Sequence, residues 1–379
     1  MGARRRQARV AAAALAAALA ACLLAAPAAT ARRVTVAVVG DSVEEGYTVQ
    51  DYADNFASVD PARVGLTPVL RDALAARAGT RPGRGFVPMH PALWRFAGAW
   101  LHTGYDFGGP GPIGASGYGS QTDDPTATAT IAVSEPQVAL LYQRSPDGGA
   151  FTVTAGGRTW RIDTRADRSD GAGETWLRVP TGARTLTVGG PVAGGTLRFL
   201  GLIARRPAPG AATQYEVSNL AHAGRRTGED LTPANAQAFT RLGIDVTVLL
   251  SGTVDEMTAD YIGGDRWEAE FAAGLRTRAR DARRTGRCIV VPPPPLPVAQ
   301  AIQRSFFAVE RRVARQEGCA FAPVLARVWR TSAASVARGL THEGIHPTAS
   351  GYGRMARALV PVVERIAAKK RREALGVRR

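Results

Sequence analysis

The sequence predicts a three-layer α/β fold in which a parallel sheet carries helices on both faces and an inserted β-sandwich interrupts the pattern. Strand-like β-branched runs alternate with segments of helical period at 32–80 and again at 210–370. Between them, residues 81–209 are rich in Gly, Thr and aromatic residues and form short alternating runs. Because this stretch lies within the α/β pattern, we predict an insertion.

The α/β elements follow one another with short connections. The first strand, 34–39, stops at Gly40, and a helix is predicted at 66–76. After the insertion, strands are predicted at 215–218, 245–250, 288–292 and 320–324, and helices at 233–242, 266–284, 298–316 and from 349 to about 373. Thr348 is the expected N-cap of the last helix.

Within the insertion, turn signals at 146–149 and 156–157 separate short alternating runs. We predict strands at 130–133, 138–143, 151–154, 159–162, 175–179, 185–188 and 197–203. Trp160 and Trp176 lie inside two of these runs, so we expect both to pack in the core of the sandwich.

The N-terminus has the composition of an export signal. Four arginines precede an apolar run at 10–26, and small residues at 29–31 offer a cleavage site, so we predict a signal peptide at 1–31. The segment ending at Cys22 also resembles a lipobox, which would make that cysteine a lipid-anchored N-terminus. Because the apolar run continues past Cys22, cleavage near Ala31 is favoured, and no transmembrane span is expected in the mature chain.

The net charge is +16 over 379 residues, and almost all of the positive charge is arginine. These arginines are spread along the chain, and no nucleic-acid-binding motif stands out. We therefore interpret the charge as favouring anionic surfaces such as a cell-envelope polymer, and not nucleic acid. The one basic cluster is the tail at 371–379.

Cys288 and Cys319 each begin an apolar run that we predict to be a strand, and these two strands are expected to be neighbours. In an oxidising compartment the two cysteines could form a disulfide. The alternative, favoured equally, is that both remain buried free thiols. The five histidines show no metal-ligand spacing, so we expect no metal and no cofactor.

The candidate chemistry lies at two distant positions. Ser42 follows the first strand in a Gly-Asp-Ser turn, at the carboxyl edge of the predicted sheet. His346 and Glu343 lie near the other end of the chain. A serine hydroxyl becomes a good nucleophile when an imidazole oriented by a carboxylate accepts its proton.

At four positions the chain resembles the SGNH/GDSL hydrolase family. The first block of that family matches residues 40–42 with Gly46, and the second matches Asn219 with Gly224. The third block matches 252–255 imperfectly, and the fifth matches 343–348. The resemblance implies a three-layer flavodoxin-like parallel sheet and carboxylic ester hydrolysis.

The resemblance also implies site roles: Ser42 as nucleophile, His346 as general base, and the backbone amides of Ser42 and Gly224 as the oxyanion hole. The sequence departs from the family twice. Glu343 stands where the family has aspartate, and it can still orient an imidazolium. Val254 stands where the family has an asparagine that donates to the oxyanion, and valine cannot donate.

The insertion is similar in layout to SGNH esterases that carry a carbohydrate-binding-module-like β-sandwich between their first two blocks, among them bacterial peptidoglycan O-acetylesterases. Aromatic side chains stack on sugar faces. We therefore name Trp94, Trp100 and Tyr105 as candidate substrate-binding residues.

These observations predict an exported, secreted or envelope-associated serine esterase that removes O-acetyl groups from a carbohydrate through an acyl-enzyme. A lipase- or thioesterase-like hydrolase of broader acyl range and an acetyltransferase are alternatives. From another class, a non-catalytic glycan-binding envelope protein could use the same scaffold, and Val254 favours that interpretation.

Overall fold

The computed structural model describes residues 32–46, 65–89, 93–103, 118–168, 171–192, 194–206, 213–229, 233–263, 266–374 and 376. The predicted signal peptide at 1–31, including Cys22, and the candidate Tyr105 lie outside these residues.

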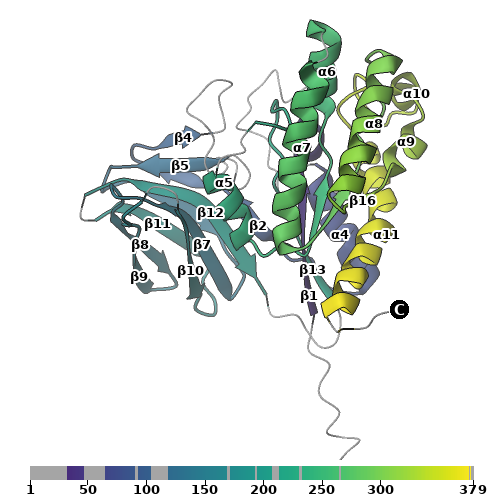
Figure 1. The fold of residues 1–379 in the computed structure, drawn as a ribbon. Coiled ribbons are helices and arrows are strands. Elements are labelled where there is room, and N and C mark those ends of the chain that lie inside the picture. The colour runs from purple at the N-terminus through teal and green to yellow at the C-terminus, as the bar shows by residue number, and fades with distance from the viewer. Residues whose placement is uncertain are drawn as a thin grey trace, which may run out of the picture.

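A five-stranded parallel sheet forms the centre of the α/β part (Figure 1). Its strands are β1 (Arg32–Val39), β13 (Thr213–Asn219), β14 (Val246–Leu249), β15 (Arg287–Val290) and β16 (Ala320–Phe321). Their spatial order is β13-β1-β14-β15-β16, and neighbouring strands are parallel. In chain order this is 2-1-3-4-5, the flavodoxin-like arrangement, so the predicted fold class is confirmed.

Helices cover both faces of this sheet. One face packs against α4 (Leu66–Ala78), α9 (Val324–Trp329) and α11 (Ala349–Ala374) through β-branched residues such as Val36 and Val248. The other face packs against α5 (Pro233–Arg241), α7 (Arg266–Thr285) and α8 (Gln300–Gln316). Three shorter helices are α2 (Ser42–Glu45), α6 (Thr253–Ile262) and α10 (Ser332–Ala337). The Thr348 hydroxyl accepts a hydrogen bond from the Gly351 N–H at 3.1 Å, as expected of the N-cap of α11.

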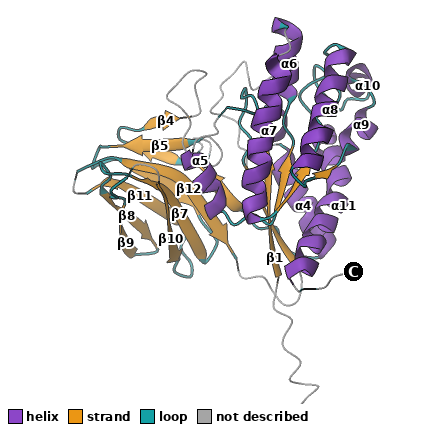
Figure 2. Cartoon of the chain, viewed as in Figure 1, coloured by secondary structure: helices purple, strands orange, loops and turns teal. Residues whose placement is uncertain are grey.

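Two antiparallel sheets lie between α4 and β13 in sequence (Figure 2). One has the order β10-β7-β12-β5-β4, with β2 paired to β12, and the other has the order β3-β6-β11-β8-β9. The strands are β2 (Gly85–Pro88), β3 (Arg95–Ala97), β4 (Leu101–Thr103), β5 (Gly119–Thr122), β6 (Thr128–Ala132), β7 (Gln137–Arg144), β8 (Ala150–Ala155), β9 (Arg158–Asp163), β10 (Gly171–Arg178), β11 (Thr185–Pro191) and β12 (Leu197–Arg205). A shared hydrophobic cluster that includes Phe151 and Phe199 lies between the two sheets. Each predicted strand of the insertion corresponds to one of β6–β12, and β2–β5 were not predicted.

Two tryptophans lie elsewhere than predicted. Trp94 is only 2% exposed, donates its indole N–H to the Pro88 carbonyl at 2.9 Å, and packs edge-on against Phe199. A ring buried in this way cannot stack on a sugar, so the substrate-binding expectation is wrong for Trp94. Trp176 is 42% exposed beneath the Arg205 guanidinium, so the core expectation is wrong for Trp176. Trp160 is half-buried against the sandwich core.

Cys288 and Cys319 form a disulfide, which resolves the two alternatives that the sequence left open. The bond joins the start of β15 to the residue before β16, and these strands are neighbours in the parallel sheet. Within the described ranges, no helix combines the length and the apolar composition that a membrane span requires. The predicted basic tail overlaps the end of α11, which runs to Ala374.

Candidate active site

The carboxyl end of β1 turns directly into the short helix α2. Asp41 is the N-cap: its side chain accepts from the Val43 N–H at 3.2 Å, while its own N–H donates to the Glu44 carboxyl group at 2.8 Å. Gly40 has to be glycine because a Cβ there would lie 2.4 Å from the Leu250 carbonyl oxygen. Ser42 is therefore fixed as the first residue of α2 at the sheet edge.

Three side chains form a continuous hydrogen-bonded chain at this edge. Ser42 Oγ lies 3.0 Å from His346 Nε2, and His346 Nδ1 is in short contact with Glu343 Oε1. The Glu343 carboxylate also accepts from the His346 backbone N–H at 3.1 Å. Ser42 is 5% exposed, and the His346 side chain is 12% exposed. In this arrangement the imidazole can accept the serine proton, and the carboxylate can stabilise the imidazolium that results.

The loop that carries His346 is closed on itself and attached to α10. The His342 N–H donates to the His346 carbonyl at 2.9 Å, and Thr341 bridges to Pro347. Ser332 Oγ of α10 donates to the Gly344 carbonyl at 3.1 Å. Gly344 has φ +91°, a backbone conformation that favours glycine. These contacts orient the imidazole before any substrate arrives.

Two backbone amides near Ser42 have no hydrogen-bond acceptor among the described residues: those of Ser42 and Gly224. The Ser42 N–H belongs to the first turn of α2, where helical N–H groups lack a partner within the helix. Gly224 lies in the turn after β13 with φ +70°. That turn is held beside β1 because the His222 N–H donates to the Gly40 carbonyl at 3.1 Å. Free amides of this kind can stabilise an oxyanion.

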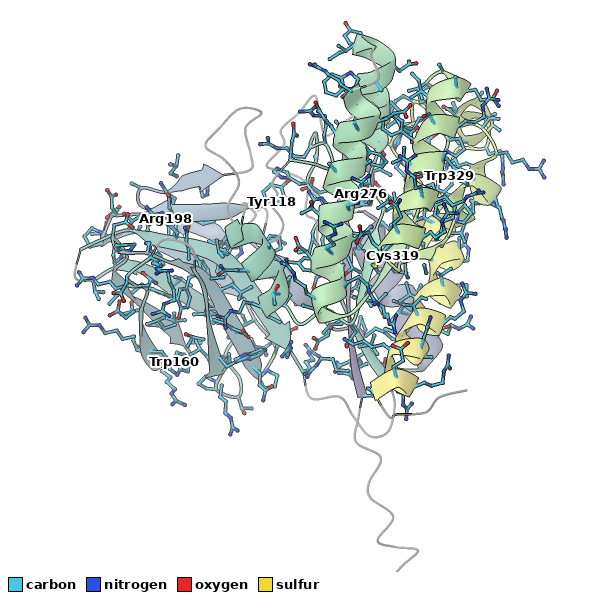
Figure 3. The ribbon with its side chains drawn as sticks, in the orientation of Figure 1. Tyr118, Trp160, Arg198, Arg276, Cys319 and Trp329 are labelled. Atoms are coloured by element: carbon cyan, nitrogen blue, oxygen red, sulfur yellow. A yellow bond between two sulfur atoms is a disulfide. The ribbon has the colours of Figure 1, made fainter. Side chains whose placement is uncertain are left out.

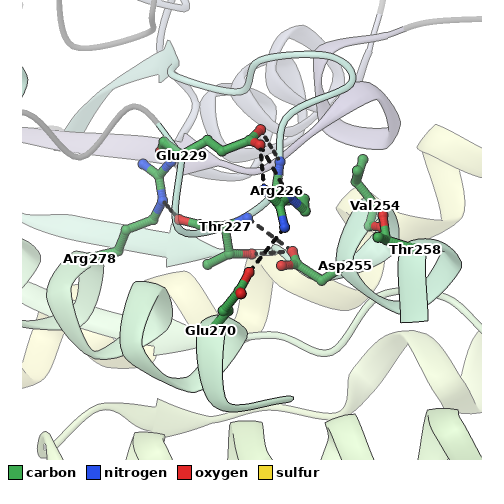
Figure 4. Close-up of polar contacts among 8 residues, drawn as sticks. All are labelled: Arg226, Thr227, Glu229, Val254, Asp255, Thr258, Glu270 and Arg278. Atoms are coloured by element: carbon green, nitrogen blue, oxygen red, sulfur yellow. Dashed lines mark hydrogen bonds and ion pairs between the residues drawn. The ribbon is translucent and has the colours of Figure 1, made fainter. Parts of the chain in front are cut away.

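A polar network holds the residues that follow Gly224 (Figure 4). The buried Asp255 carboxylate accepts from the Thr227 N–H at 2.9 Å and from its hydroxyl at 2.8 Å. Arg226 pairs with Glu229 at 3.0 Å and with Glu270 at 3.1 Å. Asp255 belongs to α6 and holds the loop after β13.

Val254 is the second residue of α6, and its side chain is half-buried. Its carbonyl oxygen accepts from the Thr258 hydroxyl at 2.7 Å (Figure 4). α6 begins where β14 ends, and β14 lies beside β1 in the sheet. Position 254 is therefore at the same edge as Ser42, and its side chain offers no hydrogen-bond donor there.

The sequence reasoning did not single out Glu45, a buried acid three residues after Ser42. Its carboxyl group accepts a short hydrogen bond from the Tyr118 hydroxyl and another from the Ala223 N–H, next to Gly224. The Tyr118 ring packs against the ring of the buried His222, with 4.8 Å between centroids. Tyr118 immediately precedes β5, so the antiparallel region contacts the candidate site directly (Figure 3). The only sequence signal for Glu45 is its spacing of one helical turn from Ser42.

Buried carboxyl groups gather beneath this edge. Burial, with a smaller contribution from the nearby Asp255, raises the pKa of Asp41 to about 7, against the opposing hydrogen bond from the Val43 N–H. Burial likewise raises the pKa of Glu45 to about 7, against the opposing influence of His222 and of the hydrogen bonds from Tyr118 and Ala223. Desolvation also raises the pKa values of Glu256 and Glu310 well above the usual range. Within the described residues, no group of His, Cys, Asp and Glu has an arrangement that could hold a metal ion.

Of the three candidate substrate-binding residues, the structure describes Trp94 and Trp100, and both pack in or against the core of the antiparallel sheets. Trp100 is half-buried, donates its indole N–H to the Ala97 carbonyl at 3.1 Å, and packs against Phe96. Trp94 is in the sandwich core, and Tyr105 is outside the described residues.

Comparison with known proteins agrees with this geometry. A family described as "GDSL-like Lipase/Acylhydrolase family" matches residues 186–354, which include Gly224, Glu343 and His346. No curated protein matches the sequence significantly. A solved structure titled "Peptidoglycan O-acetylesterase in action" aligns over 89% of this chain and 92% of its own, with a TM-score of 0.64 and 18% identity.

Two further solved structures align less closely. A protein from Bacillus subtilis aligns over 74% of this chain and 90% of its own, with a TM-score of 0.37 and 16% identity. An acetylxylan esterase from Geobacillus stearothermophilus aligns over 40% of this chain and 73% of its own, with a TM-score of 0.32 and 16% identity.

The fold and the family match together define a class of enzyme, the carboxylic ester hydrolases. Within that class, residues 186–354 match the GDSL-like lipase/acylhydrolase family, and the fold is similar to that of a solved peptidoglycan O-acetylesterase.

Proposed function

We propose that the protein is an exported serine esterase that removes O-acetyl groups from a carbohydrate. The observation that carries this proposal is the hydrogen-bonded chain from Ser42 through His346 to Glu343. The carbohydrate substrate is supported by the similarity in fold to a peptidoglycan O-acetylesterase over nearly the whole chain. Export is supported by the signal-like composition of residues 1–31.

In the proposed reaction, Ser42 Oγ attacks the acetyl carbonyl carbon while His346 Nε2 takes the hydroxyl proton. Negative charge develops on the carbonyl oxygen, where the free N–H groups of Ser42 and Gly224 can donate. The intermediate collapses when the carbon–oxygen bond to the sugar breaks, and His346 returns the proton to the departing sugar oxygen. Glu343 stabilises the imidazolium in both steps.

The second half of the reaction restores the enzyme. Water attacks the acetyl-serine carbonyl while His346 accepts one of its protons, and the same two amides stabilise the oxyanion. Collapse of this intermediate breaks the bond to Ser42 Oγ, returns the proton to the serine and releases acetate.

We also propose the domain arrangement that the sequence suggested, with hydrolase segments at 32–80 and 210–370 and a β-sandwich at 81–209. The contact between Tyr118 and Glu45 supports a role for the sandwich in shaping the substrate site. Within this proposal, Trp100 remains a candidate residue for contact with the sugar.

Hydrolysis of p-nitrophenyl esters from acetate to octanoate tests the proposal, together with acetate release from an O-acetylated glycan. Ser42→Ala is expected to lower kcat by roughly 10³-fold or more, whereas Ser350→Ala, which changes an exposed serine near the start of α11, leaves it unchanged. A rate that peaks at acetate supports the deacetylase. A flat profile, or one that rises toward octanoate, supports the lipase-like alternative instead.

Val254 favours a second candidate function, glycan binding without catalysis. A side-chain donor is missing at the sheet edge, where its loss typically costs on the order of 10²–10³ in turnover. If the wild type releases no more acetate than Ser42→Ala but is retained by an O-acetylated glycan column, the binding function replaces the esterase.

A further inference from the structure

A surface hollow of about 680 Å³ lies between α9, α10 and α11, on the side of the molecule away from the antiparallel sheets (Figure 1). We call it the arginine hollow because five arginines line it together with small apolar residues. They are Arg327, Arg330, Arg338, Arg354 and Arg357. None of the three candidate catalytic side chains lines it.

Among the residues that the structure describes, no acidic side chain pairs with the charges of the arginine hollow. No aspartate or glutamate is among its lining residues. Among the described residues, none of the five arginines forms an ion pair, in contrast to Arg33 with Glu216 or Arg280 with Glu317. Arg338 donates to the Val328 carbonyl at 3.1 Å, a neutral acceptor. Because arginine keeps its charge, these five exposed guanidinium groups form a concentrated positive patch that attracts anions.

One of these arginines also has an unfavourable backbone conformation. Arg330 has φ +64° and ψ −59°, and it is the only non-glycine residue with positive φ in the described ranges. Its N–H donates to the Ala326 carbonyl at 3.0 Å, and the preceding Trp329 is fully buried (Figure 3). The Arg330 side chain lines the hollow. Strain of this kind is typical of functional positions.

We propose that the arginine hollow binds an anionic polymer whose repeating units carry phosphate. The guanidinium groups come from α9 and α11 and from the residues that directly follow α9 and α10. A phosphate presents oxygens in several directions and can bridge such groups, whereas a planar carboxylate best fits the fork of a single arginine. Five charges around 680 Å³ also exceed what one phosphate occupies or neutralises, so a chain of phosphates fits better than a single ion.

This site is separate from the proposed esterase site and would hold the enzyme on a phosphate-rich surface. The hollow lies close to the catalytic loop in the fold, since Ser332 of α10 donates to the Gly344 carbonyl. An enzyme bound through the arginine hollow would therefore keep the proposed esterase site near the phosphate-rich surface.

Binding of linear polyphosphate to the full chain tests the proposal, measured by calorimetry across a series of NaCl concentrations. The variant Arg354→Ala/Arg357→Ala is expected to bind roughly tenfold more weakly or worse and to show a shallower salt dependence. The control Arg311→Ala/Arg312→Ala removes the same charge from exposed positions on α8, and its affinity should stay within about twofold of wild type. Both variants should hydrolyse p-nitrophenyl acetate at the wild-type rate.

Four results can overturn the proposal. Equal weakening in both double variants would show that only net charge matters. Polyglutamate of equal charge, or inorganic phosphate alone, binding as tightly as polyphosphate would exclude a phosphate polymer. Duplex DNA binding more tightly than polyphosphate would indicate a nucleic-acid surface. If Arg354→Ala/Arg357→Ala fails to fold, Arg327→Ala/Arg338→Ala is measured against the same control.

Discussion

Replacing the buried Glu45 by glutamine should change how the stability of the protein depends on pH. Glutamine keeps the shape of the side chain: its carbonyl oxygen can accept from the Ala223 N–H, and its NH₂ group can donate to the Tyr118 hydroxyl. The folded protein raises the pKa of Glu45 from 4.5 to about 7, chiefly by burial. The unfolded chain therefore loses this proton at lower pH than the folded protein does.

Because the pKa of Glu45 is higher in the folded protein than in the unfolded chain, the folded state becomes less stable as the pH rises. Glu45 stabilises the folded state fully below pH 4.5, and this contribution is lost as the pH rises to 7 and stays lost above it. A difference of this size corresponds to about 3 kcal/mol. Glutamine does not titrate, so the unfolding free energy of Glu45→Gln relative to wild type should rise by about 3 kcal/mol between pH 4.5 and pH 8.

Urea unfolding of both proteins at several pH values between 4.5 and 8.5 measures this difference. The control is Glu373→Gln, where a hydrogen bond from Arg287 lowers the pKa of an exposed carboxyl group; its stability relative to wild type should stay nearly constant over this pH range, because the contribution of Glu373 is lost only as the pH falls below about 4.5. If the wild-type and Glu45→Gln curves run parallel, Glu45 is not held protonated by burial, and the reasoning fails.

Three further predictions concern the catalytic groups and the disulfide. Glu343→Gln should lower kcat on p-nitrophenyl acetate by roughly 10³-fold, whereas Glu343→Asp should keep most of the wild-type kcat. If both variants lose kcat equally, the negative charge at position 343 is unimportant for catalysis. Val254→Asn should raise kcat by roughly tenfold or more, because a side-chain amide at the start of α6 can donate to the oxyanion. An unchanged kcat would mean that the side chain at position 254 does not reach the oxyanion. Cys288→Ser/Cys319→Ser should lower the unfolding free energy by about 3–4 kcal/mol, because the disulfide joins residues 31 positions apart. Reducing the wild type with dithiothreitol should cause the same loss. If it does not, the double variant is destabilised by poor packing of serine and not by loss of the disulfide.

The sequence was most informative where one physical signal determined the structure. β-Branched runs such as 34–39 and alternating runs such as 151–154 became strands because each signal is local. The meeting of Ser42 with His346 was expected from the family resemblance of residues 40–42 and 343–348, whereas the strand pattern alone placed only Ser42 at the carboxyl edge of the sheet.

The rest depended on packing between distant segments, which local patterns do not encode. Trp94 is buried because a second sheet covers it, whereas Trp176 of β10 stays partly exposed with the Arg205 guanidinium over its ring. Glu45 resembles an ordinary surface acid in sequence until Tyr118, 73 positions away, closes over it. The role of Asp255 likewise depends on Thr227 in a different loop.

The distance along the chain between Ser42 and His346, 304 positions, has a consequence for biosynthesis. At about 5–20 residues per second, on the order of 15–60 s separates the synthesis of the serine from that of the histidine. Throughout that interval the hydroxyl has no base, and any fragment that ends before His346 stays without one. The proposed hydrolase therefore stays inert toward the esters of the cell that makes it until the chain is complete and its last helix has docked.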